Sequence, residues 1–199
     1  DENAKNYDIE ATNDDGSCDY TDENTLDNPI TIPHIEGCDN TNPIHCMLPF
    51  PSDAFLIDDD TTNTGKRIHY SQNTIPSSGT VSPIEIPILN QMDGASPNTQ
   101  IMTAFTVEPD VSELAGQYSI GKSLDSGHST VIINQFNGEL VAHWVELDAR
   151  SEIDQPTIIH MRTVEALDHN TSYVVLLTGL MDENNQSIPT PEGFAALRD

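Results

Sequence analysis

The chain has 199 residues, of which 33 are acidic and only 7 are lysine or arginine, so its formal net charge is −26. A surface this negative repels phosphate backbones and anionic lipid headgroups, which argues against nucleic-acid binding and membrane insertion. The sequence also contains no apolar run of about 18 residues, the length of a membrane-spanning helix. The acidity itself has two interpretations: adaptation to a salty medium, or calcium binding spread over the chain.

The N-terminal segment, residues 1–45, is rich in Asn, Asp, Thr and Pro and has almost no core-forming runs. We expect it to be an extended or turn-rich acidic extension rather than an independently packed domain. Because the chain begins at Asp1 without a signal peptide, we also expect a mature or excised part of a longer exported protein.

The same segment holds a candidate Ca²⁺ loop, in which oxygen ligands at close spacing precede a glycine that permits a sharp turn. An ordinary turn rich in Asp and Asn is the competing interpretation. The candidate ligands are Asp8, Asn13, Asp14 and Asp15.

Three cysteines are an odd number for an exported protein. Cys38 and Cys46 enclose a short polar loop, and we predict a disulfide between them. Cys18 is then left over, and a partner upstream of Asp1 is the simplest explanation. Reduced thiols in a cytosolic protein are the alternative, which fits the acidic, lysine-poor composition less well.

From Cys46 onward the sequence predicts a mostly β domain over residues 46–199, after a polar linker at 21–45. Ser52 is placed to cap a short helical turn. Short runs rich in Val, Ile and Thr then alternate with turn residues, as in an antiparallel β-sandwich, and no long amphipathic helix interrupts them. The predicted strands are Ile84–Leu89, Gln100–Thr106, Thr130–Phe136, Leu140–Leu147, Thr157–Thr163 and Ser172–Thr178.

Two details refine this prediction. Asn137-Gly138 favours a tight hairpin turn, because both residues tolerate positive φ. Pro83 and Pro87 flank one predicted strand and favour a position at a sheet edge.

Two motifs match the residue patterns of catalytic loops but lack other features that those loops need. Residues 116–123 (GQYSIGKS) fit the phosphate-binding loop pattern, but no apolar strand precedes them and no helical pattern follows. Residues 127–131 (GHSTV) end in Val131 where a hydrolase nucleophile elbow needs glycine, so Ser129 is better explained as the start of a strand.

The remaining candidate chemistry is equally weak. The seven histidines show no metal-ligand spacing, although His143, beside Trp144, could face a site; a half-buried strand histidine is the commoner case. Glu146 and Asp148 share one strand face, but such pairs arise by chance among 33 acids. We therefore predict no catalytic residues in this chain.

Several motifs over residues 46–199 resemble, in their order, the N-terminal region of large secreted bacterial lipase- or esterase-like proteins, which is similar to Ig-like domains. They are CMLPFPSDAF (46–55), TGKR (64–67), MDGASP (92–97), HWVELD (143–148), LDHNTSYVV (167–175) and GFAALRD (193–199). The resemblance implies an Ig-like fold, with any hydrolase domain lying beyond Asp199. It carries over no catalytic residue, since no Gly-x-Ser-x-Gly is present.

Separately, Asn6-Tyr7-Asp8 and Asp14 to Cys18 resemble part of a cysteine-containing repeat of marine bacterial surface proteins, here covering residues 1–20. In that repeat a cysteine precedes the Asn-Tyr-Asp element. The resemblance implies calcium binding by Asp8, Asp14 and Asp15, and a partner for Cys18.

These observations lead us to expect a non-catalytic accessory or binding module of a secreted or surface-attached protein, located outside the cell. Its partner would be a downstream hydrolase domain or another surface protein. The alternative is a structural or adhesive subunit of a filament-type surface assembly, with self-association through paired edge strands. A third hypothesis is a chain that completes a hydrolase site without supplying the nucleophile.

Overall fold

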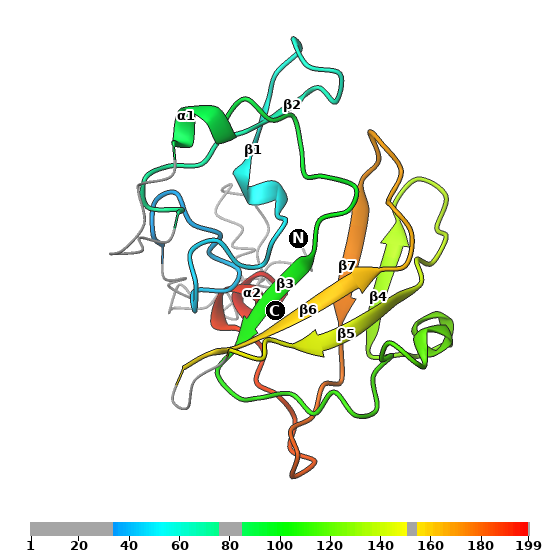
Figure 1. Ribbon diagram of the computed structural model, residues 1–199. Helices are drawn as coiled ribbons and strands as arrows, with labels where there is room; N and C mark the ends of the chain where they lie inside the picture. Colours follow the sequence, from blue (N-terminus) through cyan, green and yellow to red (C-terminus); the bar gives the residue numbers. More distant parts are fainter. Residues whose placement is uncertain (1–33, 76–84, 151–154, 199) are drawn as a thin grey trace, which may run out of the picture. The chain divides into compact units, whose positions relative to one another are not determined.

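The computed structural model describes residues 34–75, 85–150 and 155–198, which form short strands joined by long connections (Figure 1). All strand pairs among these residues are antiparallel, so the prediction of a mostly β, antiparallel fold is confirmed. The strands are β1 (Leu56–Asp58), β2 (Lys66–Ile68), β3 (Ile101–Phe105), β4 (Thr130–Asn134), β5 (His143–Leu147), β6 (Thr157–Thr163) and β7 (Tyr173–Leu177). The helices are η1 (Asp53–Phe55), α1 (Ile86–Leu89), η2 (Ile120–Leu124) and α2 (Glu192–Arg198).

Within the described residues the strands form three sheets. β6 lies between β3 and β5, β4 pairs with β7, and β1 pairs with β2 (Figure 1). Five of the six predicted strands contain β3 to β7, because their alternating or continuous apolar runs identify strands regardless of partner.

One hydrophobic core lies between the β3-β6-β5 sheet and the β4-β7 sheet. Apolar side chains at alternate positions of β3 to β7 contribute to it, as strand geometry requires. The largest fully buried apolar side chains come from both sheets: Ile132 of β4 is 0% exposed, and Ile159 and Met161 of β6 are each 1% exposed.

A smaller apolar cluster joins η1, the β1-β2 hairpin and α1. Phe55, Ile68 and Tyr70 are its buried members, and the rings of Phe55 and Tyr70 meet edge to face with centroids 5.3 Å apart. Arg67 and Asp59 form an ion pair beside this cluster.

The strand predicted at Ile84–Leu89 is wrong. Residues 86–89 form α1, with Pro87 in its first turn. Proline suits that position, since its φ is already helical and its missing N–H would have no partner there. The proline that argued for a sheet edge is equally compatible with a helix start, and the apolar cluster beneath α1 decides between them.

The turn after β4 also differs from the prediction. Gly138 has a φ of 76°, but Asn137 is not in the left-handed region, so the tight primed turn does not form. The Asn134 side chain instead accepts hydrogen bonds from the backbone N–H groups of Phe136 and Asn137. β4 and β5 join different sheets, and an isolated bridge between Ile133 and Leu140 is their remaining hairpin contact.

The predicted disulfide between Cys38 and Cys46 is confirmed, with 4.5 Å between the two Cα atoms. The loop that it closes is fixed to β3, because the Asn42 side-chain amide donates to Thr103 and to the Ala104 carbonyl. Ser52 caps η1 as predicted, accepting from the backbone N–H of Ala54. None of the helices in the described ranges is long and apolar enough to cross a membrane.

Candidate functional site

The predicted calcium ligands Asp8, Asn13, Asp14 and Asp15, like Cys18, lie outside the residues that the structure describes. Among residues 34–75, 85–150 and 155–198, no three His, Cys, Asp or Glu side chains gather into a group that could hold a metal ion.

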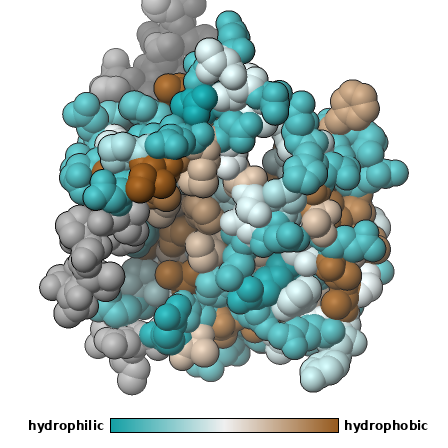
Figure 2. Space-filling model, turned by 45° about the horizontal axis from the view of Figure 1, so that its top comes forward, coloured by the Kyte–Doolittle hydropathy of each residue, from teal (hydrophilic) through white to brown (hydrophobic). Residues whose placement is uncertain are grey.

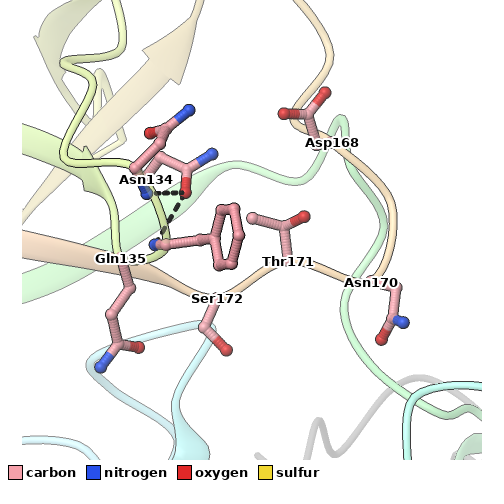
Figure 3. A pocket seen from close by; sticks show the side chains of 8 residues that line it. Asn134, Gln135, Asp168, Asn170, Thr171 and Ser172 are labelled. Carbon is pink, nitrogen blue, oxygen red and sulfur yellow. Dashed lines mark hydrogen bonds between the residues drawn. The ribbon is translucent and has the colours of Figure 1, made fainter.

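A surface hollow lies at one end of the β4-β7 sheet, between the loop that leaves β4 and the loop that enters β7 (Figure 3). Its volume is about 590 Å³. The two loops are more than 30 residues apart in sequence, but they meet because β4 and β7 are antiparallel neighbours. The lining residues are Asn134, Gln135, Phe136, Asn137, Asp168, Asn170, Thr171 and Ser172.

Local hydrogen bonds fix the shape of both loops. The first loop is held by the Asn134 caps and the backbone bond from Gly138 N–H to the Asn134 carbonyl, 2.8 Å long. In the second loop, the Tyr173 hydroxyl accepts from the backbone N–H of Asp168 at 2.9 Å. Asn170 takes a left-handed φ of 52°, which asparagine tolerates better than most residues. The hollow is therefore a feature of two ordered loops.

The lining is polar around one aromatic ring. Phe136 is 94% exposed, and Figure 3 shows an aromatic ring among amide, hydroxyl and carboxylate side chains. The side chains of Gln135, Asn170 and Ser172 make no hydrogen bond within the described part of the chain, and all three residues are exposed. Asp168 is the one carboxylate lining the hollow, a low number for a chain of net charge −26.

A second hollow of about 350 Å³ adjoins the first and shares Asn134 and Asp168 with it. Its lining is more apolar, with Leu140 and Val141 on one side and Leu167 on the other. Glu139 and Glu165 also line this second hollow. The first hollow offers amide and hydroxyl groups around an aromatic ring. This combination suits a neutral ligand rich in hydroxyl groups, because amides both donate and accept.

His143, which the sequence placed on a strand that could face a site, lies in the interior and is fully buried. Its Nδ1 lies 2.9 Å from the Val141 carbonyl, which can only accept, so Nδ1 carries the proton. The Thr130 hydroxyl, also fully buried, then donates to Nε2 over 3.0 Å. The hydroxyl–imidazole pair joins β4 to β5 inside the core and does not face the hollow.

Burial is the largest influence on His143 and lowers its pKa below the usual value of 6.5, against the opposing effect of the Val141 hydrogen bond. As pH falls below about 6.5, His143 binds a proton in the unfolded chain but stays neutral in the folded chain, so acid favours unfolding. We predict that the melting temperature falls from about pH 7 to pH 5 and that His143→Gln flattens this dependence. Circular dichroism melts at several pH values test this, with the exposed His169→Gln as the matched control. Equal pH slopes for both variants would contradict it.

The outer face of β5 and β6 carries the paired acids noted in the sequence. Glu146 bonds to Arg162 at 2.8 Å. Burial raises the pKa of Glu146, but hydrogen bonds, first from Arg162, outweigh it and leave the pKa lowered. The pKa of Asp148 is also lowered, chiefly by the backbone N–H of Arg150. Both groups stay ionised at neutral pH, so neither has the raised pKa of a general acid.

The two motifs that resemble catalytic loops, residues 116–123 and 127–131, also have structural roles in the fold. Ser123, the last residue of the phosphate-loop pattern, is 1% exposed; it donates to the Ile120 carbonyl and accepts from the backbone N–H of His143. The second half of the pattern lies in the short 3-10 helix η2 (Ile120–Leu124), where a nucleotide-binding fold needs the start of an α-helix. Ser129 directly precedes β4, and its carbonyl accepts from Thr178 N–H, as its interpretation as a strand start requires.

Comparison of the chain with protein families, with curated proteins and with solved structures finds no match. The hollow was not predicted from the sequence, although both of its loops were recognised, one as a turn and one within a family motif. The sequence pattern does not show that β4 pairs with β7, and this pairing brings the two loops together.

Proposed function

We propose that this chain is a non-catalytic binding module of a larger exported protein, and that its loop-end hollow binds a neutral, hydroxyl-rich ligand, a glycan. In this proposal residues 46–199 are an Ig-like sandwich, as the family resemblance implies. The exposed ring of Phe136, surrounded by amide and hydroxyl groups, is the observation that carries the ligand class. The apolar face of a sugar ring packs on an aromatic ring while its hydroxyls bond to amides.

Two further features support the proposal. The disulfide between Cys38 and Cys46 suits an oxidising compartment outside the cytosol. The hydroxyl–imidazole pair of Thr130 and His143 is fully buried, where it links strands rather than meeting a substrate. The likeness to the N-terminal regions of lipase-like proteins agrees with an accessory role beside a hydrolase domain.

A panel of immobilised neutral glycans, followed by titration calorimetry with the best binder, tests the ligand class. We expect Phe136→Ala to weaken binding about tenfold, because stacking on the ring contributes roughly 1–1.5 kcal/mol. Tyr118→Ala is the matched control, since Tyr118 is fully exposed and does not line the hollow. It should leave the affinity unchanged.

Absence of binding to every neutral glycan, or equal losses in both variants, would contradict a glycan site in the hollow. The non-catalytic part has its own check. Incubation of the purified chain with short ester substrates should give no turnover, and turnover that disappears in Ser129→Ala would overturn it.

Calcium binding by Asp8, Asn13, Asp14 and Asp15 is part of the same proposal. A cation that binds only the folded chain raises its stability according to the ratio of free cation to dissociation constant. We expect millimolar Ca²⁺ to raise the melting temperature and the combined Asp14→Asn and Asp15→Asn substitutions to abolish that rise. An unchanged midpoint, or the same rise in the variant, would count against this site.

A further inference from the structure

The free edge of β7 differs from the other edge of its own sheet. In an antiparallel ladder, opposite residues alternately exchange two hydrogen bonds or none. Thr178 N–H bonds to the Ser129 carbonyl and Gln135 N–H to the Ser172 carbonyl, which sets this alternation for the β4-β7 pair. The N–H and C=O groups of Tyr173, Val175 and Leu177 therefore point away from β4.

Most of the equivalent outward groups of β4 have hydrogen-bond partners. Asn134 N–H bonds to the Glu139 carbonyl, the Ile132 carbonyl accepts from Val141 N–H, and Thr130 bonds to His128. For the β7 edge, in contrast, the described part of the chain supplies no neighbouring strand, and β4 is the strand's one partner there. The edge presents three donors and three acceptors in a row.

The side chains of β7 do not protect this edge. Natural sheet edges are usually blunted by charged residues, proline or a bulge. β7 reads YVVLL and has none of these in a chain with 33 acids. Its outer face is apolar too: Val174 is 38% exposed and Leu176 45% exposed, and they lie opposite Ile133 and Val131 of β4.

Most of the face shown in Figure 2 is hydrophilic, and its hydrophobic atoms lie in several small groups. Two chains of net charge −26 repel each other, and this repulsion is smallest where their facing surfaces are uncharged. A second copy therefore meets less repulsion at the uncharged β7 edge than at an acidic part of the surface.

We propose that two copies of this chain associate through β7, in antiparallel register about a two-fold axis at Val175. In this register Tyr173 lies opposite Leu177 of the other copy and Val174 opposite Leu176, so every facing pair is apolar. Each outward N–H and C=O finds its complement, and the two-stranded sheets merge into one sheet of four strands. A two-stranded sheet is marginal alone, and additional strands stabilise it.

The pairing has two consequences. Because each copy uses the same edge, the interface closes on itself and assembly ends at a dimer. Because both copies are strongly negative, salt screens their repulsion, and the dimer should tighten severalfold as ionic strength rises. The proposal does not depend on the glycan hollow.

Sedimentation of the full chain over a concentration series, at low and high NaCl, tests the dimer. The register is tested by two charged variants, Val174→Lys with Leu176→Lys and Val174→Glu with Leu176→Glu. Each variant alone should be monomeric, since like charges then face each other, whereas an equal mixture should form a heterodimer. Tyr118→Lys, at an exposed site elsewhere, should dimerise like the wild type.

A wild-type chain that stays monomeric throughout the series would overturn the proposal, as would charged variants that dimerise unchanged or filaments that grow without limit. Hydrogen exchange on the wild type gives a second measurement, which holds even if a variant does not fold. The amides of Tyr173, Val175 and Leu177 should become more protected as protein concentration rises. Equal exchange at all concentrations would equally reject β7 as the interface.

Discussion

Ile132→Ala should lower the free energy of unfolding by about 3–4 kcal/mol, the cost of a cavity where neighbours cannot collapse. Ile132 is fully buried between the β4-β7 sheet and the β3-β6-β5 sheet. Chemical denaturation of wild type and variant measures the difference as a shift in midpoint at constant slope.

Ile133→Ala is the matched control for this substitution, because it removes the same atoms one residue later. Ile133 points to the outer face of the sheet and is partly exposed, so its loss should cost only about 1 kcal/mol. Equal losses at the two positions would contradict the two-layer arrangement, since a strand with one buried face must respond with a period of two.

Replacement of Cys38 and Cys46 by serine should lower the free energy of unfolding by about 2.5 kcal/mol, the loop-closure entropy of so short a bridge. The two cysteines are 8 positions apart, and the loop between them holds Asn42 against β3. The comparison is best made in a Cys18→Ser background, so that no free thiol exchanges with the bridge.

A reductant supplies the control for the disulfide. It should destabilise the Cys18→Ser chain by a similar amount and leave the chain without Cys38 and Cys46 unchanged. If the double serine variant is as stable as its parent, the bridge does not constrain the unfolded chain. The loop would then be held by its hydrogen bonds to Thr103 and Ala104 alone.

The docking of α2 depends on a contact between distant segments, which the sequence pattern does not predict. Gly193 lies so close to the Asn40 carbonyl that a Cβ atom there would stand 1.8 Å from the oxygen. The glycine therefore permits close contact between the C-terminal helix and the disulfide loop, elements about 150 residues apart. The sequence alone predicts neither this contact nor the need for glycine.

His143 makes the same point for the site. Strand alternation indicated which residues share its face, but not which face is the interior. Only the packing of β5 against η2 and β4 shows that the His143 ring meets Thr130 and that its backbone N–H meets Ser123. Sequence reasoning therefore identified an interesting histidine and left its environment open.

By itself the sequence determined the features that depend on neighbours along the chain. These are the positions of β3 to β7, the cap at Ser52 and the bridge between Cys38 and Cys46, all set by local periodicity, hydrogen bonding and short loop closure. The tertiary structure decided which strands pair, that residues 86–89 are helical, and that the 134–137 and 168–172 loops form one hollow. Those outcomes depend on burial between distant segments, and a linear pattern does not contain the partner against which a residue is buried.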